Sequence, residues 1–380
     1  MIRVAYIAGE PMPTRVPHLD VIAAHPDVDL TAIYAAASIQ RPEAASAPRH
    51  RMVVLRGPMV PATRLLHHDL PLTPQIWPLL SRERFDVLVI GGWSLPATQL
   101  ATVWAWTHRV PYLLLSESHG REPRPDWIRA VRRAVIPQLV RRAAGFLPTG
   151  TLAAEHIESF GAPPEAVTTF PITVDVEAVG ARVDELRARR ETIRAELGIP
   201  AEAVVVMTAG RLIPFKGVDQ LIAAVAETEA HLLVVGTGPV EEQLRAQAVA
   251  AGAPTTFAGW RTGDALLELY AASDVFGLFS RRETWGAVVV EAAAAGLPLV
   301  LTDRVGASPD LLVPGENGLL VPSGDAAAQA AGLTRLVDDP ALRERFGRRS
   351  REIALPFAYA PTADAFVEAV RRAVLLNGRR

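Results

Sequence analysis

The sequence of 380 residues contains no cysteine, so neither a disulfide framework nor thiolate chemistry is available to it. It also lacks an apolar run near the roughly 18 residues that a membrane-spanning helix needs. The opening stretch, residues 1–9, is too short for a signal peptide and is typical of a first strand. We therefore expect a cytoplasmic protein.

The sequence also lacks a large excess of either positive or negative charge. The formal net charge is -2, which gives no electrostatic reason to expect nucleic acid as a partner.

Lysine is almost absent, because Lys216 is the only lysine among the 39 basic residues. Lysine offers a compact ammonium where arginine offers a planar fork. Its retention at residue 216 indicates a functional site, and chance survival is the alternative.

What the sequence does contain is a repeated alternation of strand-like and helix-like runs, the pattern of doubly wound parallel sheets. In the first half we expect strands at residues 2–9, 29–37, 86–92, 112–117 and 145–150, and helices at 17–25, 74–85, 96–109 and 125–144. In the second half we expect strands at 203–210, 231–238, 255–260, 275–280 and 298–303, and helices at 217–227, 240–252, 264–273, 285–296 and 325–337. The fold class is therefore α/β with two Rossmann-like domains.

The expected domains follow from changes in composition. Residues 1–175 form the first domain, residues 176–200 a linker helix rich in Arg and Glu, and residues 201–358 the second domain. Residues 359–380 contain an amphipathic helix whose apolar face must dock on another element. The pattern alone does not say where.

Two carboxylates flank the start of one helix in the second domain. Glu283 lies in a charged loop after a strand, and Glu291 follows about two turns into the expected helix. From Thr284 to Glu291 this helix would rise about 10 Å, close to the separation of two sugar rings joined by a diphosphate. The amides of Thr284, Trp285 and Gly286 would face sugar or phosphate oxygens. A solvated helix with a loop charge is the alternative.

Positive charge precedes this segment, between residues 209 and 217. Arg211 and Lys216 lie between Gly210 and Gly217, where a strand ends and a helix begins, and could neutralise a diphosphate. Gly236, in a Gly-Thr-Gly-Pro turn, would permit close approach to a ligand. This is not a P-loop, because the lysine motif of that loop is absent.

In the first domain, ligands are expected beyond the carboxyl ends of the strands. Four residues at these ends are candidates for an acceptor site: Gly9, Glu10, Gly92 and Trp93. His119 also ends a strand and is a candidate contact to a ligand. The pair His67-His68 has no metal-ligand spacing and is expected in a loop.

Seven arginines crowd the segment from residue 121 to residue 142. Such a helix could lie on an anionic membrane or meet an anionic acceptor, and a solvated face is the alternative. The arginines are Arg121, Arg124, Arg129, Arg132, Arg133, Arg141 and Arg142.

The motifs of the second domain, taken together, resemble those of the retaining glycosyltransferases of family 4, which have the GT-B fold. The resemblance covers about residues 203 to 325 and rests on the segments 210–217, 235–239, 270–275, 280–291, 295–298 and 317–322. The first domain resembles the family through residues 91–92, 119–120 and 170–175.

The resemblance implies two Rossmann-like domains facing across a cleft, with the last helix crossing back to the first domain. It implies that the second domain holds a nucleoside-diphosphate sugar. Arg211 and Lys216 would bind the phosphates, Glu291 the ribose, and Glu283 with the amides of residues 284–286 the transferred sugar. His119 would reach the same sugar from the first domain.

The expected function is a retaining transfer of a hexose-type sugar from a nucleotide sugar to an acceptor hydroxyl. The acceptor could be a glycan, a lipid-linked sugar or a natural product. We expect no cofactor and no metal, since Arg and Lys supply the positive charge, and the protein could contact the inner membrane face. Three alternatives stay open: a nucleotide-sugar epimerase, a phosphorylase with pyridoxal phosphate on Lys216, and a non-catalytic partner subunit.

Overall fold

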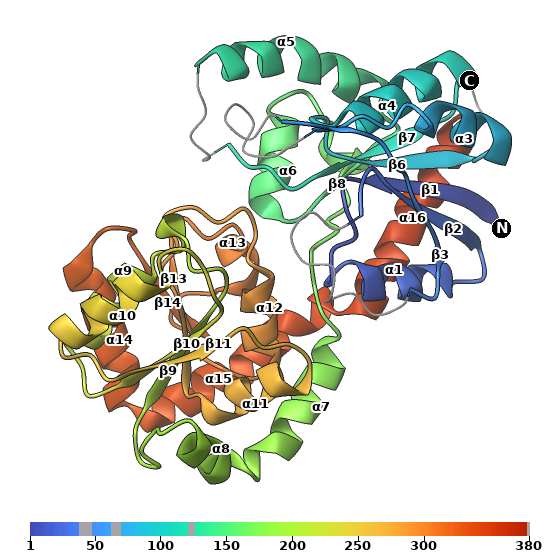
Figure 1. The fold of residues 1–380 in the computed structure, drawn as a ribbon. Helices are drawn as coiled ribbons and strands as arrows, with labels where there is room; N and C mark the ends of the chain where they lie inside the picture. The colour runs from blue at the N-terminus through green and yellow to red at the C-terminus, as the bar shows by residue number, and fades with distance from the viewer. Residues whose placement is uncertain (38–47, 62–69, 121–125, 378–380) are drawn as a thin grey trace. The chain divides into compact units, whose positions relative to one another are not determined.

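The computed structural model describes residues 1–37, 48–61, 70–120 and 126–377. These fall into two compact units (Figure 1). Unit 1 combines Met1–Ile172 with the C-terminal segment from Tyr359, and unit 2 is Thr173–Ala358. The sequence pair His67-His68 and the arginines Arg121 and Arg124 lie outside the described residues.

Unit 1 is built on a parallel sheet of six strands in the order β3-β2-β1-β6-β7-β8. Its strands are β1 (Ile2–Ala8), β2 (Val28–Tyr34), β3 (Arg51–Val54), β6 (Val87–Gly91), β7 (Tyr112–Ser116) and β8 (Gly145–Pro148). A separate antiparallel pair is formed by β4 (Met59–Val60) and β5 (Leu70–Pro71). Its helices are α1 (Val16–Ala23), α3 (Ile76–Glu83), α4 (Pro96–His108), α5 (Asp126–Arg142), α6 (Thr151–Glu158) and α16 (Tyr359–Asn377).

Unit 1 has two hydrophobic cores, one on each face of its sheet. Both form because successive side chains of a strand point to opposite faces. On β1, Val4 and Tyr6 pack with α1 and α16, whereas Ala5 and Ile7 pack with α3 and α4. Both faces are covered by helices, as a buried parallel sheet requires.

The last helix, α16, belongs to unit 1 although it follows the whole of unit 2 in the sequence. Its side chains Phe366 and Val370 are fully buried in the core beneath the sheet. The Phe366 ring lies 4.9 Å from that of Phe170, and the hydroxyl of Thr362 lies 2.9 Å from Nε2 of His18. Figure 1 shows α16 running beneath this sheet beside α1. The predicted return of the C-terminal helix to the first domain is confirmed.

Unit 2 repeats the architecture with the strand order β11-β10-β9-β12-β13-β14, again all parallel. The strands are β9 (Val205–Ala209), β10 (His231–Val235), β11 (Thr255–Gly259), β12 (Val275–Leu278), β13 (Leu299–Thr302) and β14 (Gly318–Val321). The helices are α7 (Val176–Arg187), α8 (Arg190–Glu196), α9 (Val218–Val225), α10 (Glu241–Ala250), α11 (Asp264–Ala272), α12 (Ala287–Ala294), α13 (Ser308–Leu311), α14 (Ala326–Asp338) and α15 (Pro340–Ala354).

The predicted linker helix, residues 176–200, is not a separate linker. It forms two helices, α7 and α8, that are part of unit 2. Buried Arg194 explains this, because its guanidinium donates to the carbonyl of Ala272 at 2.9 Å and to Asp274 at 2.7 Å. The same carboxylate accepts the amide of Val205 at 2.8 Å. The charges that indicated a solvated helix thus partly serve to dock it.

The strand order reverses at one point in each sheet, between β1 and β6 in unit 1 and between β9 and β12 in unit 2. Ligands of open α/β sheets bind where the order reverses, beyond the carboxyl ends of the strands. In unit 1, the loops at this point begin at Gly9 and Gly92. In unit 2, they begin at Gly210 and Phe279. Both pairs of loops carry residues that the sequence predicted for the site.

Candidate functional site

The site in unit 2 begins with two glycines that allow its loops to touch. Gly236 has a φ of +130°, and a Cβ at this position would lie 1.9 Å from the carbonyl oxygen of Gly210. The amide of Gly210 donates to Val235 at 2.9 Å, and that of Leu212 donates to Thr237 at 3.0 Å. The loops after β9 and β10 are therefore packed backbone to backbone, with no room for a side chain between them.

Lys216 ends a short 3-10 turn, Pro214–Lys216, and its ammonium forms an ion pair with the carboxylate of Glu283. Both side chains are largely buried, with exposed fractions of 19% for Lys216 and 13% for Glu283. A backbone hydrogen bond joins the two segments that carry this pair, because the amide of Arg281 donates to the carbonyl of Phe215 at 2.8 Å. The guanidinium of Arg281 also binds Asp219, in α9. The structure thus brings together two predicted site residues that lie 67 positions apart.

Gly217 allows this arrangement to form. It has a φ of +68°, and a Cβ there would lie 1.9 Å from the carbonyl oxygen of Phe279. The backbone after Lys216 therefore passes directly over the end of β12. Any side chain at residue 217 would push the lysine away from Glu283.

Backbone hydrogen bonds join the loop from Glu283 to Gly286 to the loop after β13. The amide of Glu283 donates to Arg304 at 3.1 Å, and its carbonyl accepts the amide of Gly306 at 3.0 Å. The amide of Ala307 donates to Trp285 at 2.9 Å. These bonds hold residues 283–285 outside the helix.

The expectation that helix starts at residue 285 is therefore wrong. Helix α12 begins at Ala287, after Gly286, whose φ is +101°. The 10 Å rise expected from Thr284 to Glu291 does not apply, because only the last part of that span is helical. The amides in the first turn of α12 are those after Gly286, whereas Thr284 and Trp285 lie in the loop. The Trp285 side chain is buried, with its ring 6.3 Å from that of Phe357.

Glu291 lies in α12 and accepts a hydrogen bond from the hydroxyl of Tyr270 at 2.9 Å. Burial raises the pKa of this carboxyl group to about 7, although the Tyr270 hydrogen bond acts in the opposite direction. A carboxyl group poised to change its charge near neutral pH is typical of a functional site. Arg211, the remaining predicted cation, is exposed in the loop after β9, next to the backbone of Leu212 that binds the Gly236 turn.

Unit 1 has a pocket of about 550 Å³ at its own reversal of strand order. Three of the four predicted acceptor-site residues line it: Gly9, Glu10 and Gly92. The pocket also contains Glu117 and Arg15, which the sequence did not single out. Burial raises the pKa of the Glu117 carboxyl group, and the charge of Arg15 partly offsets this.

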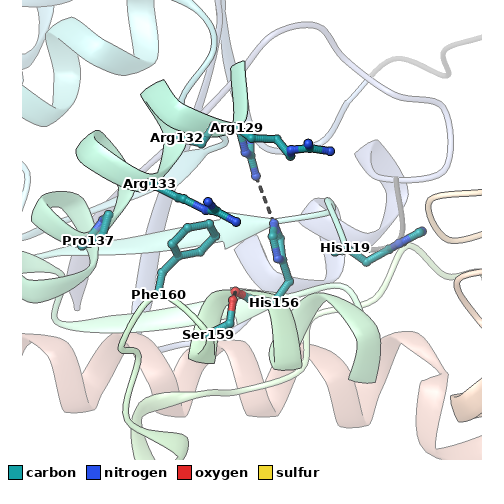
Figure 2. Close-up of a pocket in the computed structure, with 9 residues that line it drawn as sticks. His119, Arg129, Arg132, Arg133, Pro137, His156, Ser159 and Phe160 are labelled. Carbon is teal, nitrogen blue, oxygen red and sulfur yellow. Dashed lines mark hydrogen bonds between the residues drawn. The ribbon is translucent and has the colours of Figure 1, made fainter. Parts of the chain in front are cut away.

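Trp93 and His119 belong to a different part of unit 1. His119 is 4% exposed and lines a second pocket, of about 530 Å³, between α5 and α6 (Figure 2). The guanidinium of Arg132 in this pocket lies over the ring of Trp93, 4.9 Å from its centroid. Of the residues predicted for the first domain, Gly9, Glu10 and Gly92 thus line one pocket and His119 lines another, whereas Trp93 packs against Arg132 of the second pocket.

Sequence reasoning missed Tyr270, Arg15 and Glu117 as parts of these sites. Tyr270 lies in the segment 270–275, one of the motifs on which the family resemblance rests, but the motif does not indicate its hydrogen bond with Glu291. Arg15 is 2% exposed and binds the carbonyl of Pro171 at 2.8 Å. A contact between residues 156 positions apart leaves no local signal in the sequence.

The arrangement of each unit defines the class of protein. Two wound parallel sheets, each with its loops gathered where the strand order reverses, make up the GT-B fold. A crystal structure of Alr3699/HepE from Anabaena, in complex with UDP and glucose, has the same fold. It matches with a TM-score of 0.74 and 19% identity, over 98% of this chain and 100% of that one.

Family models match both units. The model of glycosyl transferases group 1 matches residues 189–353, and that of the glycosyl transferase 4-like domain matches residues 18–173. The D-inositol 3-phosphate glycosyltransferase of Saccharomonospora viridis is 31% identical over 82% of this chain and 70% of its own length. The lipopolysaccharide core biosynthesis glycosyltransferase LpsE of Rhizobium meliloti is 36% identical over 46% of this chain and 52% of its own length. The chain belongs to glycosyltransferase family 4.

Membership of the family identifies the protein as a glycosyltransferase whose partners are a nucleotide sugar and an acceptor. Within the described part of the chain, no helix combines the length and apolar composition that crossing a bilayer requires.

Proposed function

We propose that the protein transfers a hexose-type sugar from a nucleoside-diphosphate sugar to an acceptor hydroxyl, with retention of configuration at the anomeric carbon. The observation that carries this proposal is the largely buried Lys216–Glu283 ion pair beside the two close-packed glycine loops of unit 2. It offers a cation for the leaving diphosphate next to a carboxylate for the hydroxyls of the sugar.

The leaving group determines what this site must do. A departing nucleoside diphosphate gains negative charge, and preorganised cations and amides lower the energy of that state. Lys216 is held by its ion pair with Glu283, and Arg211 lies on the same loop, so we place both cations beside the leaving diphosphate. The departing phosphate can itself take the acceptor proton, so the chemistry needs no nucleophile from the chain.

Glu291 is proposed to hold the ribose. Tyr270 occupies one of its carboxylate oxygens, which leaves the other to accept hydrogen bonds from ribose hydroxyls. An ionised carboxylate accepts these bonds better than a neutral acid does. Since the pKa of Glu291 is about 7, nucleotide binding should strengthen as the pH rises from 6 to 8.

The glycine pocket of unit 1 is proposed as the acceptor side, and His119 is proposed to contact the transferred sugar. Gly9 and Gly92 supply a wall without side chains beside the carboxylate of Glu10, which suits a polyhydroxylated acceptor. A glycan, a lipid-linked sugar and a natural product all fit this chemistry. The inositol phosphate in the name of one relative adds a phosphorylated polyol to these candidates.

The test of the donor site uses Lys216→Ala and Glu283→Ala. We expect each to reduce transfer from a nucleotide sugar by at least about 100-fold while the melting curve stays cooperative. Glu344→Ala is the matched control, because Glu344 forms an exposed pair with Arg348 on α15, away from these loops. Transfer at near the original rate by either site variant would contradict the proposal.

Retention and independence of metal are tested on the product. We expect NMR spectroscopy to show the same anomeric configuration in donor and product, and an excess of chelator to leave the rate unchanged. Independence of metal follows from an Arg–Lys site that neutralises the diphosphate by itself, whereas retention follows from the resemblance to the retaining family. An inverted product, or a rate restored only by a divalent cation, would contradict them.

The alternative activities have their own signatures. A phosphorylase using pyridoxal phosphate on Lys216 would give a Schiff-base absorbance above 300 nm in the purified protein, and we expect none. An epimerase would convert the donor sugar without an acceptor. A non-catalytic partner would bind nucleotide without any turnover, for which the intact Lys216–Glu283 pair has no evident use.

Contact with the inner membrane face is a second proposal, favoured by the outer face of α5. Trp127, Val131 and Val135 recur at every fourth residue and are exposed by 50%, 54% and 48%. Exposed Arg133 and Arg141 lie on the same helix. Such a helix can bury its apolar stripe in the interface of an anionic bilayer. We expect co-sedimentation with phosphatidylglycerol vesicles and not with phosphatidylcholine vesicles, and loss of binding in Val131→Ser.

A further inference from the structure

The pocket at the reversal of strand order in unit 1 contains polar side chains to which the proposed function gives no role. Tyr34 ends β2, Glu117 follows the end of β7, and Arg15 precedes α1. All three line this cavity of about 550 Å³, a volume within the range of small-molecule sites. The fold therefore gathers polar groups here from three separate segments of the chain.

Tyr34 carries a hydroxyl group that has no partner in the described part of the chain. Its side chain is 1% exposed, and the hydroxyl is buried without a hydrogen bond. Burial raises the pKa of Tyr34, so the hydroxyl keeps its proton and remains a donor. A buried hydroxyl without a partner costs stability, and a ligand that accepts its hydrogen bond removes this cost. The Tyr34 hydroxyl therefore indicates a polar ligand in the pocket.

Tyr6, on the neighbouring strand β1, lies beside the same groups. Burial raises the pKa of Tyr6, the charge of Arg15 lowers it, and the charge of Glu117 raises it again. Tyr6 and Tyr34 lie on the same face of the sheet, because both pack in the core with α1 and α16. The pocket thus has two phenol hydroxyls as donors close to one carboxyl group.

Glu117 supplies a hydrogen-bond acceptor. Its carboxyl group lines the pocket and makes no hydrogen bond or ion pair with a described residue. Burial raises the pKa of this group, and the charge of Arg15 lowers it, so the two residues interact without an ion pair between them. A carboxylate accepts at two oxygens, which matches two neighbouring hydroxyls of a polyol.

Arg15 does not make this pocket a site for anions. The residue is 2% exposed, and its guanidinium donates to the carbonyl of Pro171 at 2.8 Å and lies over the ring of Phe170, 4.2 Å from its centroid. Among the described residues that line the pocket, Arg15 is the only cation, whereas Glu10 and Glu117 are carboxylates. A phosphate in this pocket would therefore meet more carboxylates than cations.

We propose that Tyr34 and Glu117 select the acceptor by binding an uncharged polyol end of it, which carries no phosphate. The inference rests on the proposed glycosyl transfer and adds the residues that hold the acceptor and the class of group that they hold. One hydroxyl of a sugar or cyclitol accepts from Tyr34 while a neighbouring hydroxyl donates to Glu117. A phosphate dianion only accepts, so it leaves the carboxylate of Glu117 without a donor.

The test measures polyol binding to the full chain by saturation-transfer NMR spectroscopy. The probes are myo-inositol and methyl glucoside, with myo-inositol phosphate and glucose phosphate as the charged counterparts. We expect Tyr34→Phe to weaken binding of the uncharged probes by about threefold to tenfold, and Glu117→Gln by about tenfold to a hundredfold, because they remove a neutral and a charged hydrogen-bonding group. We expect Glu117→Gln to strengthen binding of the two phosphates, because it removes a like charge.

Melting temperatures separate a contact with ligand from a contact within the fold. We expect Tyr34→Phe to keep or raise the melting temperature, because it removes a hydroxyl that has no partner in the described part of the chain. The matched control is Tyr112→Phe. The Tyr112 hydroxyl donates to the carbonyl of Leu139 at 2.6 Å and accepts from Trp106 at 3.1 Å, outside this pocket. We expect the control to melt at a lower temperature and to bind polyols as the parent does.

The matched control for Glu117→Gln is Glu155→Gln, which removes an equal charge from an exposed position on α6. No binding of either polyol to the parent, or equal binding by the parent and both pocket variants, would overturn the proposal. Tighter binding of the phosphates than of the polyols, if it depends on Tyr34 or Glu117, would overturn it too. So would a lower melting temperature of Tyr34→Phe, which would show that the hydroxyl is bonded within the fold.

Failure of the proposed function gives a different result. If Lys216→Ala keeps full transfer activity while Tyr34→Phe and Glu117→Gln lose polyol binding, the donor chemistry proposed for unit 2 fails and the polyol site stands. If Lys216→Ala loses transfer while the pocket variants bind polyols as the parent does, the polyol site fails and the proposed transfer stands.

Discussion

At the scale of single residues, Lys216 lies in a space that suits the narrow ammonium group of a lysine. The end of the Lys216 side chain lies beside the backbone of Gly210, since a Cβ at Gly210 would be 3.8 Å from its Cε. An arginine at this position would carry a wider head group into the same space between Gly210 and Glu283. We expect Lys216→Arg to reduce kcat/KM by about 10-fold to 100-fold, because the loss of one well-aligned hydrogen bond between charged groups has an effect of this size. Activity equal to that of the parent would show that any cation suffices.

Glu291 provides a test through pH. Its pKa of about 7 in the folded chain exceeds the ordinary value of 4.5, so the folded state binds more protons than the unfolded state between these two values. Stability from this group is therefore lost as the pH rises from about 4.5 to 7. We expect Glu291→Gln to stabilise the ligand-free protein at pH 8 by about 1–3 kcal/mol, and to leave it unchanged at pH 4.5. Urea unfolding at the two pH values measures the difference, and equal effects at both would contradict the raised pKa.

The residues of the proposed donor site could be named from the sequence because each lies in a motif that follows the end of a strand. Lys216, Glu283 and Glu291 were named in this way, but the contacts that they make were not. The ion pair of Lys216 with Glu283 and the hydrogen bond of Glu291 with Tyr270 depend on how loops and helices pack. Spacing along the chain carries no information about such contacts.

At the scale of elements, α16 is the part of unit 1 that arrives from a distance in the sequence. Phe366 is fully buried against Phe170 and the strands above it. We expect Phe366→Ala to destabilise unit 1 by about 3–5 kcal/mol through the cavity that it leaves. Leu375→Ala on the same helix is the control, because Leu375 is 66% exposed. Hydrogen exchange should show faster opening of β1 and β6 and unchanged protection of β9 and β12.

The elements that the sequence did not predict have physical reasons for being missed. Strand β3 has four residues, and β14 follows a turn whose glycines dominate the local pattern. The start of α12 was placed two residues early, because apolar periodicity continues through Trp285 and Gly286. The backbone bonds from Gly306 and Ala307, which keep these residues out of the helix, come from another loop.

At the scale of the whole molecule, a nucleotide that binds only the folded protein must raise its melting temperature. We expect UDP, GDP, TDP or ADP, or one of their sugars, to do so, with about 2.7 kcal/mol of stabilisation at 100 times its Kd. The Lys216→Ala variant should lose most of this shift, whereas Arg132→Gln should keep it. A screen in which no nucleotide shifts the melting temperature of the parent would contradict the proposed role of unit 2 as the donor domain.

The chain enters unit 2 once and leaves it once, between Ile172 and Thr173 and again between Ala358 and Tyr359. Unit 2 is thus an uninterrupted segment, whereas unit 1 is assembled from two. During synthesis, every residue of unit 2 is added to the chain before the first residue of α16. Unit 2 can therefore begin to fold while the sheet of unit 1 still lacks one of its covering helices, and the apolar face that α16 will cover is a binding site for a chaperone.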